Sequence, residues 1–401
     1  MEKRRLYMDY SATTPVKKEV LDEMMPYFTE NFGNASSFHT FGREAKTALD
    51  KARGQVANLI NAKPNEIYFT AGGTESDNWA IEGVAFAHRS KGNHIITSKI
   101  EHHGILHICE YLEKHHGFEV TYLDVDAEGR VKLDELEKAI KDTTILISIM
   151  FANNEIGTIQ PIKEIGEIAK KHNVLFHTDA VQAAGNVPID VKELNVDLMS
   201  MSSHKIYGPK GIGALYIKTG TKLHSFVHGG AQERRRRAGT ENMPSIVGYG
   251  KAAELAKTNM DEHIERLTSL RTKLIDGILE KIPYTRVNGS LENRLPGNVN
   301  FSFEFIEGEG ILLMLDMLGI AASSGSACTS GSLDPSHVLM AIGLTHEWAH
   351  GSLRLTVGDF TTDEDIDYIL EKLPPVIERL RMLSPLYNTY LKEQKEKQAV
   401  K

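Results

Sequence analysis

Cysteine is almost absent from this sequence, in which Cys109 and Cys328 are the only two among 401 residues. Two cysteines cannot form the disulfide framework typical of small secreted proteins, and they make no paired motif of the kind found in zinc ribbons. We therefore expect a reducing compartment, the cytoplasm, for this chain.

Long apolar segments are missing as well. Apolar runs such as residues 311–315 are far shorter than the roughly 20 residues that a membrane-spanning helix needs. The basic residues 3–5 are followed by Asp9 without any apolar stretch between them, so the pattern of a signal peptide does not develop. From these absences we expect no signal peptide and no membrane partner.

Positive charge is also in short supply. The chain has 46 Lys and Arg against 54 Asp and Glu, a formal net charge of −8. This balance argues against a nucleic-acid groove or an anionic membrane surface, because both attract net positive charge. The four arginines at 234–237 could form a nucleic-acid patch, but in an acidic chain they are more typical of a solvated or anion-contacting loop.

Short runs rich in β-branched residues alternate with helical patterns between residues 60 and 220. This alternation is typical of βαβ units and predicts an α/β fold with a mostly parallel sheet. The seven expected strands are 66–70, 94–98, 119–124, 144–151, 174–178, 196–201 and 212–217.

After residue 245 the pattern changes to long helices and a few short strands. Strands are expected near 297–303 and 352–357, and helices at 308–318 and 362–383, with a frayed charged tail from Lys392. A chain of this length exceeds what one core usually supports. We predict a large domain over residues 16–260 and a smaller α+β domain made of residues 1–15 and 261–401.

The first expected strand runs into Ala71-Gly72-Gly73-Thr74, directly before a helical pattern. Glycines at a strand-to-helix turn let backbone N–H groups and the helix N-terminus hold a phosphate. A tight turn with a helix cap explains the same residues equally well. No Gly-Lys-Ser/Thr follows, so the turn is not a Walker loop.

Polar residues follow two later strands at the edge where open α/β sheets bind ligands. Asp179 ends one of these strands, and the next ends in Ser202-Ser203-His204-Lys205. Asp179 and Lys205 could form a plain salt bridge. They are also the pair that pyridoxal phosphate requires, a lysine to bind it covalently and an aspartate to keep its ring nitrogen protonated. Ser202 and His204 would then add phosphate donors.

Two further strand ends carry candidates. His102 follows the strand at 94–98, and with His103, His107 and Cys109 it could be read as a zinc cluster, although a helix points these side chains in different directions. A flat imidazole stacked on a cofactor ring suits His102 better. Asn154 follows the strand at 144–151 and offers an amide at the same edge.

The two cysteines lie in unlike surroundings. Cys109 belongs to the apolar face of a helix and is expected in the core. Cys328 lies among ten small residues, 323–332, which we expect to form a mobile loop that exposes the thiol. It is either an incidental surface cysteine or a nucleophile.

Arg354 alternates with leucines in the expected strand at 352–357. An arginine in this position makes either a buried ion pair or a bidentate clamp for a substrate carboxylate. The sequence pattern does not separate the two.

Taken together, the motifs resemble the cysteine desulfurases of the pyridoxal phosphate class V aminotransferase superfamily, in their iron-sulfur-assembly and nitrogen-fixation branch. The similarity extends over nearly the whole chain. The motifs that carry it are residues 8–15, 74–78, 101–102, 153–157, 179–182, 202–208, 228–230 and 238–242, and the loop around Cys328.

The resemblance implies a fold-type I enzyme that binds pyridoxal 5'-phosphate and works as a homodimer. Lys205 would bind the cofactor covalently, Asp179 would pair with the ring nitrogen, and His102 would stack on the ring. Further cofactor contacts are implied for Gly73, Thr74, Asn154, Gln182, Ser202 and His204, and for Thr240 from the second subunit. The implied ligands of the substrate carboxylate are Asn34, Asn154 and Arg354.

By the same resemblance Cys328 would form a persulfide from L-cysteine, and an iron-sulfur scaffold protein would accept the sulfur. Two alternatives stay open. One is a selenocysteine lyase or another class V aminotransferase, for which Cys328 would be dispensable. The other is a non-catalytic sulfur carrier that docks a scaffold, which the C-terminal stretch 383–387 could serve in either case.

Overall fold

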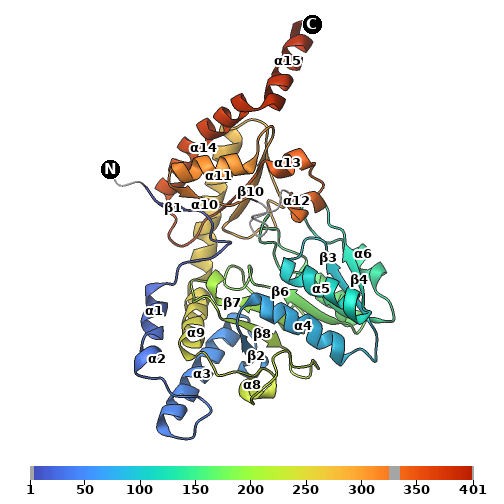
Figure 1. The fold of residues 1–401 in the computed structure, drawn as a ribbon, viewed down its shortest axis with the longest axis vertical. Helices are drawn as coiled ribbons and strands as arrows, with labels where there is room; N and C mark the ends of the chain where they lie inside the picture. Colours follow the sequence, from blue (N-terminus) through green and yellow to red (C-terminus); the bar gives the residue numbers. More distant parts are fainter. Residues whose placement is uncertain (1–3, 325–334, 400–401) are drawn as a thin grey trace.

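The computed structural model describes residues 4–324 and 335–399, and its main element is a seven-stranded sheet (Figure 1). The strand order across it is β2-β8-β7-β6-β5-β3-β4. Its strands are β2 (Ile67–Thr70), β3 (His94–Ser98), β4 (Glu119–Leu123), β5 (Thr144–Ser148), β6 (Leu175–Asp179), β7 (Leu198–Ser202) and β8 (Gly213–Ile217).

All seven strands lie where the sequence predicts them, with β5 ending three residues earlier than expected. The pairs from β7 through β6, β5 and β3 to β4 are parallel, whereas β8 is antiparallel to both of its neighbours. The prediction of a mostly parallel sheet is confirmed. At the carboxyl end of β6, Asp179 lies opposite Ser200 of β7, which fixes the register at the edge where the candidate residues lie.

Helices cover both faces of the sheet, and alternate strand residues supply the two apolar layers. One layer joins Ile95 and Leu146 to α4 (Gly73–Ala87) and α5 (His103–His116). The opposite layer joins Ile96 and Ile147 to α3 (Thr40–Leu59), α7 (Ile162–Lys171) and α9 (Met243–Thr258). Strands buried on both faces are rich in apolar residues, such as Ile145, Leu146 and Ile147 of β5, and these short runs predict them from the sequence.

A second core lies above the sheet in Figure 1 and has its own strands. A three-stranded antiparallel sheet has the order β12-β10-β9, and a two-stranded parallel sheet pairs β1 with β11. These strands are β1 (Leu6–Tyr7), β9 (Thr285–Val287), β10 (Asn298–Phe303), β11 (Ile320–Ala321) and β12 (Ser352–Thr356).

The helices of this second core are α10 (Met260–Lys281), α11 (Gly308–Met317) and α14 (Asp363–Leu383). Leu6 and Met8 from the start of the chain pack into it, and α10 reaches it from the first core, to which Met260 belongs. The domain boundaries at residues 16 and 260 stay a prediction.

The remaining elements are short, apart from the last helix. They are α1 (Lys18–Met24), α2 (Pro26–Thr29), η1 (Pro64–Glu66), α6 (Leu133–Ala139), η2 (Ser203–Lys205), α8 (Gln232–Arg235), α12 (His337–Ala341) and α13 (His346–His350). The expectation of a frayed tail from Lys392 is wrong, since α15 (Pro385–Ala399) continues through it and projects from the body in Figure 1. Glutamate, glutamine and lysine dominate this stretch, and all three favour helices. Within residues 4–324 and 335–399, no helix combines the length and apolarity that crossing a bilayer requires.

Candidate active site

A cavity of about 470 Å³ opens at the carboxyl edge of the large sheet, between the turn after β2 and the end of β7. The N-terminus of α4 faces it through Gly73 and Thr74, and Ser202 and His204 line the opposite wall. The first turn of a 15-residue helix presents unpaired N–H groups and a partial positive charge. Four of the predicted phosphate ligands therefore meet at one anion-binding cavity.

Local hydrogen bonds fix the turn that leads into this helix. The hydroxyl oxygens of Thr70 and Ser76 lie 2.7 Å apart, and each lies 3.1 Å from the Gly72 carbonyl oxygen, so one hydroxyl donates to the other, which in turn donates to the carbonyl. The Glu75 carboxylate accepts the Ala71 N–H at 3.0 Å. These contacts hold the chain in one shape, so the helix N-terminus is oriented before any ligand arrives.

His204 is uncharged at neutral pH in this cavity. Burial, together with the positive charges of Lys205 and Lys210, lowers the pKa of its imidazole to about 4. Its Nδ1 lies 3.1 Å from the Thr13 hydroxyl. His204 therefore offers an anion a neutral hydrogen bond, while Lys210, which also lines the cavity, supplies positive charge.

Asp179 is a buried carboxylate with one hydrogen bond to its side chain, donated by the Val181 N–H to Oδ1 at 2.8 Å. Burial raises the pKa of Asp179, and the charges of His102 and Lys205 oppose this increase. A carboxylate in this state is ready to pair with a cationic group that enters the site.

His102 caps the N-terminus of α5, where its Nδ1 accepts the Gly104 N–H at 3.0 Å. Burial lowers the pKa of His102, and the Asp179 charge partly restores it. Because Nδ1 is used as an acceptor, the neutral ring carries its proton on Nε2. The cap thus fixes both the position of the imidazole and its tautomer.

Lys205 follows β7 in the short helix η2, and its Nζ reaches the N-terminal segment. It donates to the Ser11 carbonyl at 2.5 Å and to the Ala12 carbonyl at 2.8 Å. Gln182 donates to the same Ser11 carbonyl at 3.0 Å. Residues 11–13 belong to the motif at 8–15, but no role in the site was predicted for them. Nothing in their local sequence indicates a contact with Lys205.

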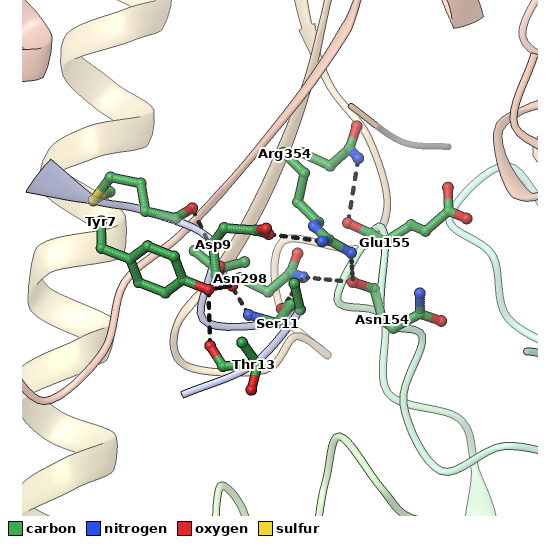
Figure 2. A network of polar contacts seen from close by, with 12 residues as sticks. Tyr7, Asp9, Ser11, Thr13, Asn154, Glu155, Asn298 and Arg354 are labelled. Carbon is green, nitrogen blue, oxygen red and sulfur yellow. Dashed lines mark hydrogen bonds and ion pairs between the residues drawn. The ribbon is translucent and has the colours of Figure 1, made fainter. Parts of the chain in front are cut away.

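Arg354 lies in β12 with its guanidinium turned toward two other segments (Figure 2). Nη2 lies 2.8 Å from Oδ1 of Asp9, and Nη1 donates to the Asn154 carbonyl at 3.0 Å. Nε is buried and has no hydrogen-bond partner in the described part of the chain. Of the two roles that the sequence left open for Arg354, the ion pair is formed.

The segment around Asn154 is held from several sides. The Asn154 carbonyl also accepts Nδ2 of Asn298 at 3.3 Å, and the Glu155 carbonyl accepts Nδ2 of Asn300 at 3.2 Å. The Glu155 carboxyl accepts the Ser336 hydroxyl at 2.5 Å, and burial raises its pKa to about 7. The bonds from Asn298 and Asn300 link the segment after β5 to β10 of the second core, and none of these bonds was expected from the sequence.

Two predicted residues do not join this site within the chain. Asn34 is exposed and accepts the Ser36 N–H, and its loop between α2 and α3 lies at the bottom of Figure 1, far from β10, the strand that pairs with β12. Thr240 is exposed and does not line the cavity. A contribution of Thr240 from a second subunit stays a prediction. Cys328 lies outside the described residues.

Cys109 is buried in the core beside α4, as expected, and burial raises the pKa of its thiol. The zinc alternative is not supported by this arrangement, because Cys109 faces away from the cavity into the apolar layer. Across residues 4–324 and 335–399 no three histidine, cysteine, aspartate or glutamate side chains are grouped to hold a metal ion.

The fold and this constellation define a pyridoxal phosphate enzyme. The anion cavity at the start of α4 fits a phosphate group, and Asp179 provides a buried negative charge for a protonated ring nitrogen. Lys205 directly follows His204, which lines the cavity, and its charge lowers the pKa of both His204 and Asp179. These residues fit the chemical needs of the cofactor.

Sequence comparison identifies the family. The model of the class-V aminotransferase family matches residues 6–369, and the chain belongs to that family. A cysteine desulfurase IscS from Clostridium botulinum is 60% identical over 396 residues, which cover 98% of this chain and 100% of the relative. Another, from Methanosarcina thermophila, is 61% identical over 385 residues, 96% of this chain and 95% of the relative.

Solved structures agree with this assignment. A NifS-like protein superposes with a TM-score of 0.89 at 40% identity and covers 94% of this chain and 100% of its own. SspA in complex with cysteine superposes with a TM-score of 0.79 at 39% identity, covering 89% of this chain and 100% of its own. The fold-type I architecture predicted from the motifs is confirmed.

Proposed function

We propose that this chain is a cysteine desulfurase, which converts L-cysteine to L-alanine and collects the sulfur as a persulfide on Cys328. The observation that carries this proposal is the electrostatic coupling of Lys205, Asp179 and His102 at the sheet edge where Gly73, Thr74, Ser202 and His204 line an anion cavity. Relatives at 60% identity bear the name cysteine desulfurase, and a similar solved structure holds cysteine. Both the named relatives and the solved structures thus support the resemblance to NifS-like and IscS-like proteins.

The substrate carboxylate binds at Arg354 and the side chain of Asn154, beside the Asp9 ion pair. Lys205 would hold the cofactor covalently, and its Nζ would take the Cα proton of the substrate. When bound, pyridoxal phosphate would draw off the electrons left at Cα. Asp179 would hold the proton on the ring nitrogen, and His102 would stack on the ring with its Nε2–H available. Gln182 would contact the ring hydroxyl.

The phosphate is held by Gly73, Thr74, Ser202 and His204, with Thr240 added from the second subunit of a homodimer. Cys328 attacks the substrate sulfur as a thiolate, so that an S–S bond forms while the bond between Cβ and sulfur breaks. The electron pair of the broken bond stays on the substrate carbon, which takes a proton and leaves as alanine. No external oxidant or reductant enters this step.

The persulfide then passes its sulfur to a scaffold protein for iron-sulfur cluster assembly in the cytoplasm. Asn34 lies on the loop between α2 and α3 and is exposed in the single chain. We include it only as a residue of the second subunit that would contact the substrate. The homodimer, the scaffold and the cytoplasmic location rest on the family resemblance.

Replacing each cysteine in turn tests the proposal. Cys328→Ala should bind the cofactor and turn yellow, yet carry no persulfide and release no sulfide from cysteine. Cys109→Ala is the matched control, because that thiol is buried in the core, and it should keep both activities at a modest loss of stability. Peptide mass mapping after addition of cysteine should place the extra sulfur on Cys328. Undiminished sulfide release by Cys328→Ala would contradict the mechanism and favour a selenocysteine lyase or an aminotransferase.

A further inference from the structure

Asp77 is a buried acid to which the proposed reaction gives no part. It lies on α4 one turn after Gly73 and is 1% exposed. Its Oδ1 has no hydrogen-bond partner among the described residues. An ionised carboxylate without such partners is costly to bury, so either a cation neutralises Asp77 or a proton does.

The nearest basic group cannot act as that cation. Nε2 of His177 lies 3.8 Å from Oδ1 of Asp77 and bonds instead to the Ser200 hydroxyl at 3.0 Å. Nδ1 of His177 bonds to the Ser148 hydroxyl at 2.9 Å. Burial lowers the pKa of His177 to about 3, so its ring is neutral at physiological pH.

The other charged groups that face Asp77 are acids. Asp179 follows His177 by two positions on β6, and Glu101 lies just before α5, where it accepts the Met150 N–H and the Ser98 hydroxyl. On the α5 side, a Cβ atom at Gly104 would lie 3.4 Å from Oδ2 of Asp77 and 3.1 Å from Nδ1 of His102. Asp77 is therefore enclosed by two acids, a neutral imidazole and the cap of α5.

The positive charges of the site act on Asp179 rather than on Asp77. His102 and Lys205 both favour the ionised form of Asp179. Two neighbouring carboxylates in a buried site do not both ionise, so the one nearer to positive charge takes the negative charge.

We propose that Asp77 is a positioning residue that remains protonated in the folded protein and so leaves Asp179 as the single ionised carboxylate of this neighbouring pair. The benefit to the cofactor rests on the proposed function, because one negative charge then pairs with one ring-nitrogen proton. Burial raises the pKa of Asp77 well above its usual range, the charge of Asp179 adds to this, and the Ser200 hydroxyl offsets part of it.

The Asp77→Asn variant distinguishes a protonated Asp77 from an ionised one, because asparagine keeps the shape of the side chain and stays neutral at every pH. A pKa raised in the folded state makes the folded protein bind more protons than the unfolded chain. Wild-type stability should therefore fall as pH rises from about 4 toward the folded pKa, and Asp77→Asn should lack the part of that loss that Asp77 causes, while other buried acids such as Glu155 keep theirs.

The measurement is the melting temperature of the full chain between pH 4 and pH 9, with and without pyridoxal phosphate. Asp77→Asn should gain about 1–2 °C over wild type per pH unit between pH 4 and the folded pKa of Asp77, and the two should meet near pH 4. Asp77→Ser, which also removes the titrating group, should show the same slope. The control is Asp276→Asn, an exposed change on α10 of equal charge, which should leave the slope unchanged.

Two readouts separate this role from a structural one. An infrared difference spectrum, wild type minus Asp77→Asn, should show a protonated carboxyl signal at neutral pH. The absorbance of the bound cofactor should keep its neutral-pH form in Asp77→Asn but lose any alkaline transition due to Asp77. A variant less stable than wild type at every pH, or a difference spectrum with only an ionised carboxylate, would overturn the proposal. If the chain bound no cofactor, the proposed function would fail, while the melting and infrared results would still decide the state of Asp77.

Discussion

Arg354 and Asp9 form an ion pair between residues 345 positions apart in the chain, with Nη2 and Oδ1 at a distance of 2.8 Å. The arginine side chain is 3% exposed and the aspartate side chain 19%. Nη1 is fixed at the same time by the Asn154 carbonyl, as Figure 2 shows. The guanidinium is therefore held in one orientation by the N-terminal segment and by the end of β5, before any substrate carboxylate reaches it.

Arg354→Lys should weaken the binding of cysteine more than it slows the reaction. Lysine keeps the positive charge but loses the planar fork that makes two parallel bonds to a carboxylate. We expect KM for cysteine to rise about 10- to 100-fold, with a smaller change in kcat. Initial rates over a range of cysteine concentrations measure both. Arg379→Lys on the exposed face of α14 is the control, and equal KM increases in both variants would contradict a role in substrate binding.

Asp9→Asn should destabilise the protein because it leaves the buried Arg354 charge without its counter-ion. Loss of one partner from a buried pair costs about 3–5 kcal/mol, and the partial exposure of Asp9 places the expected loss near 2–3 kcal/mol. Denaturant titration gives the value. Asp365→Asn is the comparison, since its partner Arg4 is 40% exposed and such pairs contribute about 1 kcal/mol or less. Equal losses in the two variants would show that burial of the Arg354 pair is unimportant.

The strands of the large sheet were predictable because the residue pattern that indicates a strand is local in the sequence. A strand buried on both faces is rich in apolar residues, and β5 shows this with Ile145, Leu146 and Ile147 between its two polar ends. The order of the strands and the reversed direction of β8 depend on connections between distant segments, and no local pattern encodes them.

The same distinction explains which site residues the sequence could identify. Asp179 and Lys205 follow strands of one sheet, and the geometry of parallel strands brings their ends to a common edge. Ser11, Ala12 and Asp9 reach the site from the other end of the chain, through contacts across 193 to 345 residues. Arg354 stayed ambiguous for this reason, since its partner had no local signal.

Gly213→Ala should weaken cofactor binding from outside the cavity. An added Cβ atom would lie 2.7 Å from the carbonyl carbon of Gly72 and 2.6 Å from the Met201 carbonyl oxygen. Backbone on both sides cannot yield as a flexible side chain would, so the phosphate turn must move. We expect about tenfold or greater loss of pyridoxal phosphate affinity and a stability loss of about 1–3 kcal/mol.

Titration of the chain with pyridoxal phosphate and denaturant unfolding measure these two effects. Gly54→Ala is the matched control, because a Cβ there meets nothing within 4 Å and the position lies inside α3. That change should stabilise the protein by about 0.5–1 kcal/mol. Unaltered cofactor affinity in Gly213→Ala would show that the turn does not depend on its contact with β8.

His204→Asn should change how the stability of the protein depends on pH below neutrality. Burial lowers the pKa of His204 to about 4 in the folded chain, with help from Lys205 and Lys210, while the unfolded value is 6.5. Between pH 6.5 and 4 the unfolded chain binds more protons, so wild-type stability falls as the pH falls through this window.

Asparagine does not titrate, and the His204→Asn variant should therefore lose less of its melting temperature between pH 6.5 and pH 4 than wild type does. The full chain without pyridoxal phosphate is the sample to use, because a bound phosphate would itself shift the His204 pKa. The exposed His107→Asn, on the solvent side of α5, serves as the control and should follow the wild-type curve. Parallel curves for wild type and His204→Asn would mean that His204 accepts its proton as readily in the folded chain as in the unfolded one, and the cavity would then present a cation rather than a neutral donor at this position.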